Sequence, residues 1–489
     1  MGQLFFVSIS MLIIAVNAAS DQSLQSKLAG KIDYVVAADG SGDYKTVQEA
    51  INAVADDNPS RKVIFIKSGA YNEKIVVPYK KTNLTIVGEN VDKTIITHND
   101  ASKETIAMNG FTSYTFRPDA DDFTAMNLTI RNTATNAQAV ALHTNGDRQV
   151  FLHCRIRGFQ DTYLTNLRTR VYFKDCFIEG AVDFIYGWGI NLLDSCQIHV
   201  IREKGYMTAA ATSKNYRFGF VFRNCKLTNS SAVSSYYLGR PWFPYAKTVF
   251  FTCNESAALN AAGWAAWAGR EDSCYYREYK CTGGGSNTSR RVAFGKQLTD
   301  QEAKIYELDT IFSKNSYPQG PTADTAEVNA ILRRFLVSTT PNMEQIALEI
   351  LKCGRDTYPP LPADDWRPRV DTDAVYSVVR SNTVKFLDSG TVTIKRHTIE
   401  TGAVHGYAVT LHYPLRDRIT FDVTTNQPAE AIVTVFDLMG KAVLNKRFSS
   451  LWPGGNCLSF YPSPLKQGIY CYSIAVRGQS IRGKFEIIK

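Results

Sequence analysis

The sequence predicts an all-β protein, built as a right-handed parallel β-helix followed by a small C-terminal β-sandwich. Two observations lead to this prediction. Short β-branched and aromatic segments recur at an interval of about 22 residues, with no long amphipathic helix between them. The last part of the chain consists of short strand-like segments separated by turns, such as "AIVTVFDLMG" and "GIYCYSIAVRG".

The composition limits the possible classes of protein. A chain of 489 residues with 44% hydrophobic residues can form two or three domains with a large core. The net charge of +9 is spread along the chain. It could favour an acidic polymer, or belong to an ordinary solvated surface. We expect no nucleic-acid partner, because no block is rich in Lys or Arg. With no CxxC pair and no spaced His/Cys cluster, we predict no metal site.

The first twenty residues, "MGQLFFVSISMLIIAVNAAS", predict a secretory signal peptide over residues 1–20. An apolar run from Leu4 to Val16 precedes the small residues 18–20. This run is too short for a comfortable membrane span, and no other segment comes close. We therefore expect an exported, soluble protein, in a compartment with which ten cysteines are compatible.

The repeat is the main indication of the fold. "NLTI" occurs at 83–86 and again 44 residues later, at 127–130. Steps of 22 residues from there reach "QVFL" at 149–152 and "VYFK" at 171–174. In a solenoid, such segments stack on successive coils at a spacing of about 4.8 Å. The segment 44–54, "YKTVQEAINAV", has helical spacing and would cap the open end.

A second lane of the repeat consists of cysteines. Cys154, Cys176, Cys196 and Cys225 follow one another at steps of 22, 20 and 29 residues. We interpret them as an inward-facing stack of small apolar residues. Neighbouring coils could bring two of these thiols close enough for a disulfide, but free, buried thiols are our preferred interpretation.

The same period stacks two acidic residues. Asp161 in "GFQDTYL" and Asp183 in "GAVDFIYG" are 22 residues apart, so they should lie on neighbouring coils and face the same side. Gln138 precedes Gln160 by the same 22 residues. We therefore expect two carboxylates and two amides to form one row over three coils.

Such a row could perform acid–base and nucleophilic chemistry. Two close carboxylates do not both ionise readily, so one keeps its proton while the other stays charged. The amides offer N–H donors for an oxyanion, and Arg240 in "YLGRPW" offers a cation for the ionised acid. Trp242 could stack on a sugar ring. A purely structural interpretation is also open, since Gln and Asp ladders can simply satisfy the backbone. The motifs GxSxG, HExxH and the P-loop are absent from the sequence.

These segments together resemble the pectinesterase (pectin methylesterase) family. The resemblance covers residues 33–315 and consists of six motifs in order, "GAYNE", "QAVAL", "GFQDT", "GAVDFIYG", "LGRPW" and "GWAAWAG". It implies a right-handed parallel β-helix that hydrolyses methyl esters of polygalacturonate in pectin and releases methanol. It also implies that no metal or organic cofactor takes part.

The resemblance assigns roles to the row residue by residue. Asp183 is expected to be the nucleophile, and Asp161 the general acid and then the general base. Gln138 and Gln160 are expected to stabilise the tetrahedral oxyanion. Arg240 is expected to hydrogen-bond Asp183 and keep it ionised.

The resemblance also implies substrate contacts. Trp242 and Trp264 are expected to line the groove, and Tyr186 occupies a contact position where the family usually has Phe. Two further departures flank the chemistry: residues 163–164 read Tyr-Leu instead of the commoner Leu-Tyr, and Trp188 replaces a usual Asn. These changes affect the expectation for subsite preference rather than for the reaction.

The remaining chain divides into two segments. Residues 316–372 contain two helical patterns broken by prolines, and we expect a helical hairpin or covered linker there. Residues 373–489, the predicted β-sandwich, resemble the sorting domain of type IX secretion substrates, which implies outer-membrane secretion machinery as a partner. A carbohydrate-binding module is the alternative, but it has only Trp452 to offer as a platform. Cys457 and Cys471 could form a disulfide there.

Two rival functions remain at this stage. A non-catalytic pectin-binding solenoid would need Trp242 and a basic groove but neither acid. A pectate lyase would need clustered carboxylates for calcium and a basic proton abstractor, and the sequence shows no such cluster. We expect a monomer with methyl-esterified pectin as its substrate.

Overall fold

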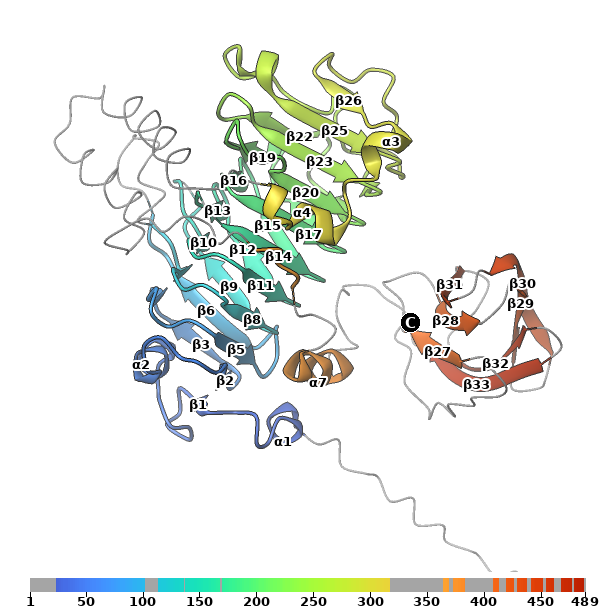
Figure 1. Cartoon of the computed structure of the whole chain (residues 1–489), viewed down its shortest axis with the longest axis horizontal. Coiled ribbons are helices and arrows are strands. Elements are labelled where there is room, and N and C mark those ends of the chain that lie inside the picture. The colour runs from blue at the N-terminus through green and yellow to red at the C-terminus, as the bar shows by residue number, and fades with distance from the viewer. Residues whose placement is uncertain are drawn as a thin grey trace, which may run out of the picture. The chain divides into compact units, whose positions relative to one another are not determined.

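The structure is a computed structural model, and it describes most of the β-helix and parts of the C-terminal region (Figure 1). The chain forms two compact units, residues 1–379 and 380–489. The described residues are 23–101, 113–135, 137–167, 169–316, 364–368, 373–382, 408–412, 419–425, 429–437, 441–451, 454–460, 468–476 and 479–487. The predicted signal peptide and both helical patterns of the predicted linker lie outside these residues.

The first unit is a right-handed parallel β-helix made of three parallel sheets, as predicted. Each coil contributes one strand to each sheet, and successive coils lie side by side in Figure 1. Sheet A contains β1 (Tyr34–Val36), β2 (Lys62–Ile66), β5 (Leu84–Gly88), β8 (Thr124–Met126), β11 (Gln149–Leu152), β14 (Arg170–Lys174), β17 (Ile190–Asp194), β20 (Phe220–Arg223), β23 (Lys247–Phe251), β25 (Tyr275–Tyr279) and β26 (Gly295–Gln297).

The other two sheets complete each coil. Sheet B contains β3 (Gly69–Asn72), β6 (Thr94–His98), β9 (Thr129–Asn132), β12 (Arg155–Arg157), β15 (Phe177–Gly180), β18 (Gln197–Val200), β21 (Lys226–Asn229) and β24 (Asn254–Glu255). Sheet C contains β4 (Ile75–Val77), β7 (Phe116–Pro118), β10 (Leu142–Thr144), β13 (Tyr163–Thr165), β16 (Ile185–Gly187), β19 (Gly205–Ala210) and β22 (Tyr236–Pro241).

The strand register confirms part of the predicted repeat and corrects another part. Gln149 pairs with Val171, so 149–152 and 171–174 stack at a step of 22 residues (171 − 149). The prediction that 127–130 stacks beneath 149–152 is wrong, because Val150 pairs with Thr124, a step of 26 (150 − 124). The two "NLTI" segments therefore occupy different places in the coil. Connections between sheets vary in length, so only the strands keep a common register.

A left-handed residue ends every strand of sheet A from β8 to β25. Each of these residues has a positive φ of 46–56° and turns the chain sharply toward sheet B; they are Asn127, His153, Asp175, Ser195, Asn224, Thr252 and Lys280. Asn and Asp tolerate this backbone region better than most residues. The next residue then points inward, and from His153 onward that residue is a cysteine.

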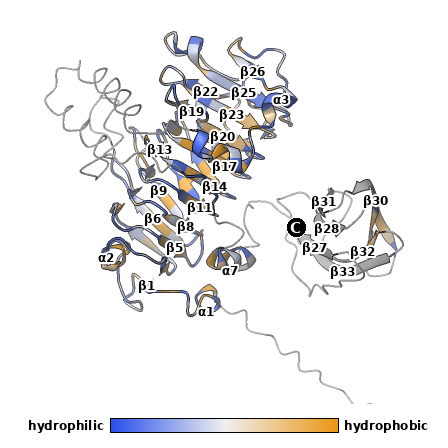
Figure 2. Ribbon diagram, viewed as in Figure 1, coloured by the Kyte–Doolittle hydropathy of each residue, from blue (hydrophilic) through white to orange (hydrophobic). Residues whose placement is uncertain are grey.

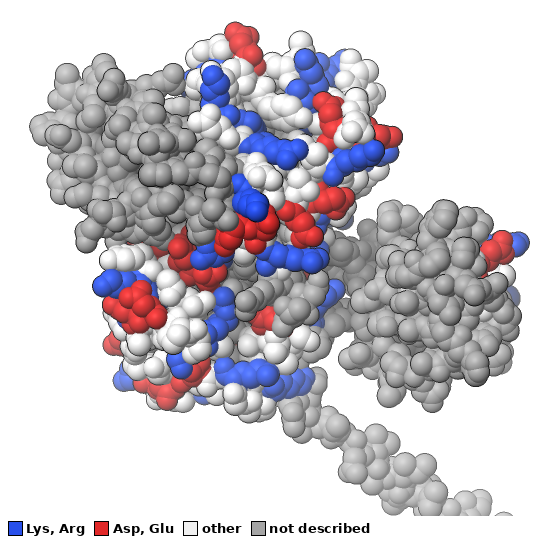
Figure 3. All heavy atoms as spheres, viewed as in Figure 1, with Lys and Arg blue, Asp and Glu red and all other residues white. Residues whose placement is uncertain are grey.

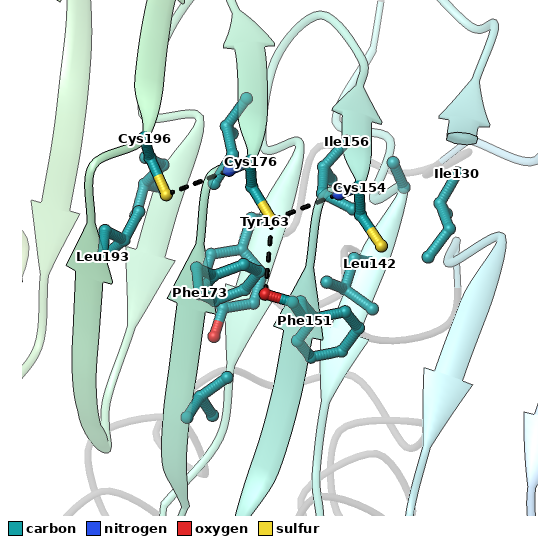
Figure 4. Packing of buried hydrophobic residues seen from close by; sticks show 14 of the residues in the cluster. Ile130, Leu142, Phe151, Cys154, Ile156, Tyr163, Phe173, Cys176, Leu193 and Cys196 are labelled. Carbon is teal, nitrogen blue, oxygen red and sulfur yellow. Dashed lines mark hydrogen bonds between the residues drawn. The ribbon is translucent and has the colours of Figure 1, made fainter. Parts of the chain in front are cut away.

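The cysteine lane lies in the interior, as predicted, and is longer than the sequence steps indicated. It runs through Cys154, Cys176, Cys196, Cys225, Cys253 and Cys281, all with free thiols. The Cys154 amide donates to the Cys176 sulfur at 3.4 Å, and the Cys176 amide donates to the Cys196 sulfur at 3.4 Å (Figure 4). Stacked aromatic rings fill the space beside the lane, with Phe151 and Phe173 centred 4.9 Å apart.

The N-terminal end of the solenoid is capped by α2 (Val47–Ala53), within the predicted helix 44–54. The helix begins later than predicted because Thr46 caps it: the Thr46 hydroxyl accepts from the Glu49 amide, and Glu49 returns a bond to the Thr46 amide. Three of its residues, Val47, Ala50 and Ile51, are fully buried and close the core.

Short helices cover the outer face of sheet A, where apolar side chains also point outward (Figure 2). They are α1 (Leu24–Lys27), α3 (Asp300–Ala303), α4 (Leu308–Ile311) and α7 (Ala374–Asn382), with the 3₁₀ turns η2 (Arg270–Ser273) and η3 (Lys314–Ser316) elsewhere in the unit. The fully buried Arg170 binds Asp147 and Asp364 at 2.6 and 2.8 Å, which ties the segment 364–368 to the solenoid. Val375 and Tyr376 of α7 pack on this face too, so the boundary between the units follows residue 379 rather than 372.

The second unit contains two antiparallel sheets, in keeping with the predicted small β domain. One consists of β27 (Ala408–His412), β28 (Ile419–Thr425) and β31 (Gly454–Phe460); the other consists of β29 (Ala429–Phe436), β30 (Ala442–Leu451), β32 (Gly468–Val476) and β33 (Gln479–Ile487). The possible disulfide between Cys457 and Cys471 is not formed, because Cys471 is a free thiol. The two cysteines lie on strands of different sheets, β31 and β32.

Two surface properties bear on location and partners. Among the described residues, no helix is long and apolar enough to span a bilayer. On the face that Figure 3 shows, Lys and Arg alternate with Asp and Glu rather than forming one basic patch. The charge of the protein is thus distributed, as the sequence indicated.

Candidate active site

The predicted row lies along sheet C, where the chain enters successive strands. Gln138 and Gln160 face each other in an isolated parallel bridge before β10 and β13. Tyr163 pairs with Ile185, a step of 22 that places Asp161 next to Asp183 on the following coil. The Asp161 amide donates to the Val182 carbonyl at 3.1 Å, which fixes this register at the acids themselves. The structure therefore brings these residues together.

Both acids sit on strained backbone. Asp161 has φ 64° and Asp183 has φ 49°, in the left-handed region. This conformation costs roughly 1 kcal/mol for a residue with a side chain, although aspartate tolerates it better than most. The two side chains are also buried, with residue exposures of 5% and 6%. A buried, strained pair of acids is expensive for stability, and such pairs are concentrated at functional sites.

Arg240 reaches the second acid from β22, two strands further along sheet C. Its Nε and Nη2 atoms donate to the two carboxylate oxygens of Asp183 at 2.9 and 2.6 Å. This two-pronged geometry is the strong form of an Arg–carboxylate pair. Gly239 allows the close approach of β22, since a Cβ there would lie 1.9 Å from the Thr208 hydroxyl oxygen.

Two aromatic rings that the sequence reasoning missed hold Arg240. Its guanidinium carbon lies 4.2 Å from the ring centre of Tyr206 and 4.0 Å from that of Trp267. Tyr206 stacks in turn on Tyr237 at 5.3 Å. Register could have identified Tyr206, because Ile185 pairs with Thr208 and the same step of 23 carries Asp183 onto Tyr206. The rings orient the guanidinium toward Asp183.

The electrostatics of the two acids differ in cause. Burial raises the pKa of Asp161 well above its usual range, and the nearby Asp183 raises it further, while Arg240 opposes the shift. Burial also raises the pKa of Asp183, but the hydrogen bonds and charge of Arg240 lower it. No described group donates a hydrogen bond to the Asp161 carboxyl. Asp161 is therefore the acid that keeps a proton, and Asp183 the one that is held ionised.

An aromatic cluster adjoins the acids on the outer face of sheet C. Trp242 is half-buried, and its ring centre lies 5.7 Å from Tyr186, 5.2 Å from Trp188 and 5.0 Å from Phe243. Trp188, the departure from the usual Asn, is 2% exposed and supports Trp242 from behind. Tyr186 and Trp242 thus lie beside the acids.

The expectation that Trp264 lines the groove is wrong. Trp264 is 1% exposed and stacks on Tyr276 in the interior, with ring centres 4.4 Å apart. Its indole N–H finds no partner there. The motif "GWAAWAG" places its first tryptophan inward and its second, Trp267, on Arg240. Alternation along an extended chain separates the two rings, and the sequence does not reveal which one faces out.

No group of three or more His, Cys, Asp or Glu residues in the described part of the chain could hold a metal ion. The chemistry available at the row is that of the acids, amides and arginine themselves. A nucleophilic carboxylate beside a protonated carboxyl can attack an acyl carbon and protonate the leaving group.

Comparisons with known proteins agree with this site. The family model "Pectinesterase" matches residues 33–315. A pectinesterase of Daucus carota is 40% identical over 275 residues, covering 53% of this chain and 85% of that protein. Pectinesterase 31 of Arabidopsis thaliana is 37% identical over 282 residues, covering 55% of this chain and 88% of that protein.

Solved structures give the same result. The pectin methylesterase from carrot aligns with a TM-score of 0.55 at 35% identity, over 59% of this chain and 97% of that one. A pectin methylesterase in complex with a hexasaccharide aligns with a TM-score of 0.52 at 28% identity, over 60% of this chain and 100% of that one. Since the family model matches more than half of the 489 residues, this chain belongs to the pectinesterase family.

Proposed function

We propose that this protein hydrolyses the C6 methyl esters of galacturonate in pectin, giving pectate and methanol, through the row on sheet C. One observation carries the proposal. The two acids lie on neighbouring coils, and Arg240 hydrogen-bonds only Asp183, so the pair is divided into an ionised and a protonated member. An ester hydrolase that uses a carboxylate nucleophile needs this division.

The first half of the reaction forms an acyl-enzyme. A carboxylate oxygen of Asp183 attacks the C6 carbonyl carbon, and the carbonyl oxygen becomes an oxyanion. Gln138 and Gln160, half-buried and paired at the head of the row, supply the amide N–H donors for that oxyanion. The intermediate collapses as the bond to the methoxy oxygen breaks, and Asp161 gives its proton to that oxygen. Methanol leaves, and Asp161 becomes ionised.

The second half returns the enzyme to its starting state. A water molecule attacks the acyl carbon while Asp161 takes its proton. The bond between the acyl carbon and Asp183 then breaks, so Asp183 is again a carboxylate beside Arg240. Activity should fall at low pH as Asp183 is protonated, and at high pH as Asp161 loses its proton, because both pKa values are raised by burial.

The proposed polymer contacts lie on the aromatic side of the row. Trp242 is the ring that stacks on a sugar, with Tyr186 beside the reacting residue. Trp267 and Tyr206 act through Arg240. Trp264 has no such role, since it lies in the interior.

The rest of the proposal concerns location. We propose export directed by residues 1–20, an esterase domain over 33–315, a linker over 316–372, and a C-terminal domain that serves outer-membrane secretion machinery in the manner of a type IX sorting domain. The protein would act as a monomer at the cell surface or outside the cell. Support comes from the apolar leader and the separate antiparallel unit after residue 379.

The test incubates the full chain with highly methylated pectin and records methanol, acid and the absorbance of unsaturated products. Methanol with an equal amount of acid supports the esterase. Absorbance without methanol indicates a lyase, and neither product indicates a binding solenoid; both results contradict the proposal. Mass spectrometry of the secreted form tests the two processing steps at residues 1–20 and in the C-terminal region.

A further inference from the structure

The hydroxyl of Tyr186 is a buried polar group without a partner. Tyr186 lies in β16, three residues after Asp183, and is only 4% exposed. Its hydroxyl makes no hydrogen bond to any described residue. Folded proteins rarely leave a buried hydroxyl unbonded, because removing it from water is costly. A phenylalanine would fill the same space without that cost.

The surroundings of this hydroxyl cannot satisfy it. On sheet C, Tyr186 pairs with Leu164 on one side and Ala209 on the other. The outer aromatic cluster continues with Trp188 and Trp242. All of these side chains are apolar where they meet Tyr186. A hydrogen bond made in such an environment is stronger than one made in water, so a ligand atom that accepted it would be held firmly.

The hydroxyl is directed toward the acids. After burial, the charges of Asp161 and then Asp183 are what raise the pKa of Tyr186, so the phenol stays protonated and can only donate usefully. Neither acid hydrogen-bonds it. Space therefore remains between the phenol and the carboxyl of Asp161, and an atom bound there would meet both groups.

We propose that the Tyr186 hydroxyl donates a hydrogen bond to the ester methoxy oxygen that Asp161 protonates, and then to the attacking water that takes the place of that oxygen. The inference rests on the proposed function and adds a catalytic residue to it. Tyr186 transfers no proton: the proton on methanol comes from Asp161, and the proton of the water returns to Asp161. The phenol stabilises the negative charge that develops on the methoxy oxygen as its bond to carbon breaks.

The chain offers a matched control in Tyr163. Its hydroxyl is also buried, but it donates to the Asn191 side chain at 2.6 Å and lies 3.1 Å from the Thr144 hydroxyl. It faces the interior beside Phe173 rather than the acids (Figure 4). Tyr163→Phe and Tyr186→Phe each remove one buried phenolic oxygen, one from a satisfied position and one from an unsatisfied position.

The experiment measures methanol release and thermal unfolding for both variants in the full chain. We expect Tyr186→Phe to lower kcat about tenfold, the effect of one transition-state hydrogen bond, and to change KM less than twofold. Its Tm without substrate should equal or exceed that of the wild type. Tyr163→Phe should lower Tm and leave kcat within twofold.

A second substrate isolates the step. Polygalacturonate esterified with 2-fluoroethanol has a better leaving group, which needs less help, so the loss caused by Tyr186→Phe should shrink with it. An unchanged kcat in Tyr186→Phe, a fall in Tm as large as that of Tyr163→Phe, or an equal loss on both esters overturns the inference. If the wild type releases no methanol at all, the proposed function fails instead.

Discussion

Two clusters in this β-helix contain the same three charged groups and behave differently. One is the row residues Asp161 and Asp183 with Arg240; the other is Glu255 and Glu278 with Arg291, near the C-terminal end of the solenoid. Arg291 donates to both glutamates, at 3.2 and 2.8 Å, and also to three backbone carbonyls. All three side chains of that cluster are at most 3% exposed.

Arg240 distributes its donors unequally. It hydrogen-bonds Asp183 only, and two aromatic rings hold its flat faces. Its side chain is 25% exposed. The C-terminal cluster is therefore a closed structural staple, whereas the row is open and leaves Asp161 without a donor. The comparison teaches that two acids and an arginine do not define a site; the unequal sharing of the arginine does.

The largest expected effect comes from removing the nucleophile. Asp183→Asn should lower kcat by about 10⁴-fold or more, because the amide cannot form the acyl-enzyme. Asparagine tolerates positive φ and retains the volume, so circular dichroism should show an intact fold. Glu278→Gln is the matched control in the staple, and its methanol release should stay within twofold. Substantial turnover by Asp183→Asn would contradict the role assignment.

Exchanging the two arginines for methionine tests the comparison directly. Arg291→Met leaves two buried carboxylates without donors, so we expect a loss of about 3–5 kcal/mol in the free energy of unfolding. Arg240→Met should lose less stability, because its side chain is partly exposed, but should lower kcat by at least about 10²-fold. Denaturant unfolding and methanol release separate the outcomes. If both variants lose stability equally and retain activity, the distinction between staple and site is wrong.

Asp161→Asn should stabilise the protein while inactivating it. The folded state binds the Asp161 proton more tightly than the unfolded chain, so the free energy of unfolding falls as pH rises from the ordinary aspartate pKa through the raised pKa of Asp161. An amide avoids that loss. We expect Tm at pH 7 to rise by roughly 2–4 °C and to match the wild type at pH 3, below both pKa values. A lower Tm at pH 7 would be evidence for an unseen donor to Asp161.

The smallest effect on turnover should come from the tryptophans. Trp242→Ala should raise KM about fivefold to tenfold with little change in Tm, because one ring face is removed from the bound polymer. Trp264→Ala should instead lower the free energy of unfolding by about 3–5 kcal/mol, as expected for a large core residue. Pectin titrations and thermal scans distinguish them. A KM effect confined to Trp264→Ala would reverse our placement of the two rings.

The sequence predicted the solenoid and the core of the row. A step of 22 residues is a statement about strand register, and register places Asp161 beside Asp183 and Cys154 beside Cys176 without further information. The same reasoning failed for 127–130, where the coil has 26 residues. The 17-residue stretch between β6 and β7 (99–115) already shows how freely the connections vary.

What the sequence by itself determined, then, is which residues stack, because pairing between neighbouring coils is local and repeats along the chain. Only the tertiary structure decided which ring of "GWAAWAG" faces the acids and how Arg240 divides its donors. It also decided that Tyr206 lies against the guanidinium and that the Tyr186 hydroxyl remains unbonded. Those outcomes depend on side-chain direction, burial and the packing of connections of unequal length, none of which has a period to read.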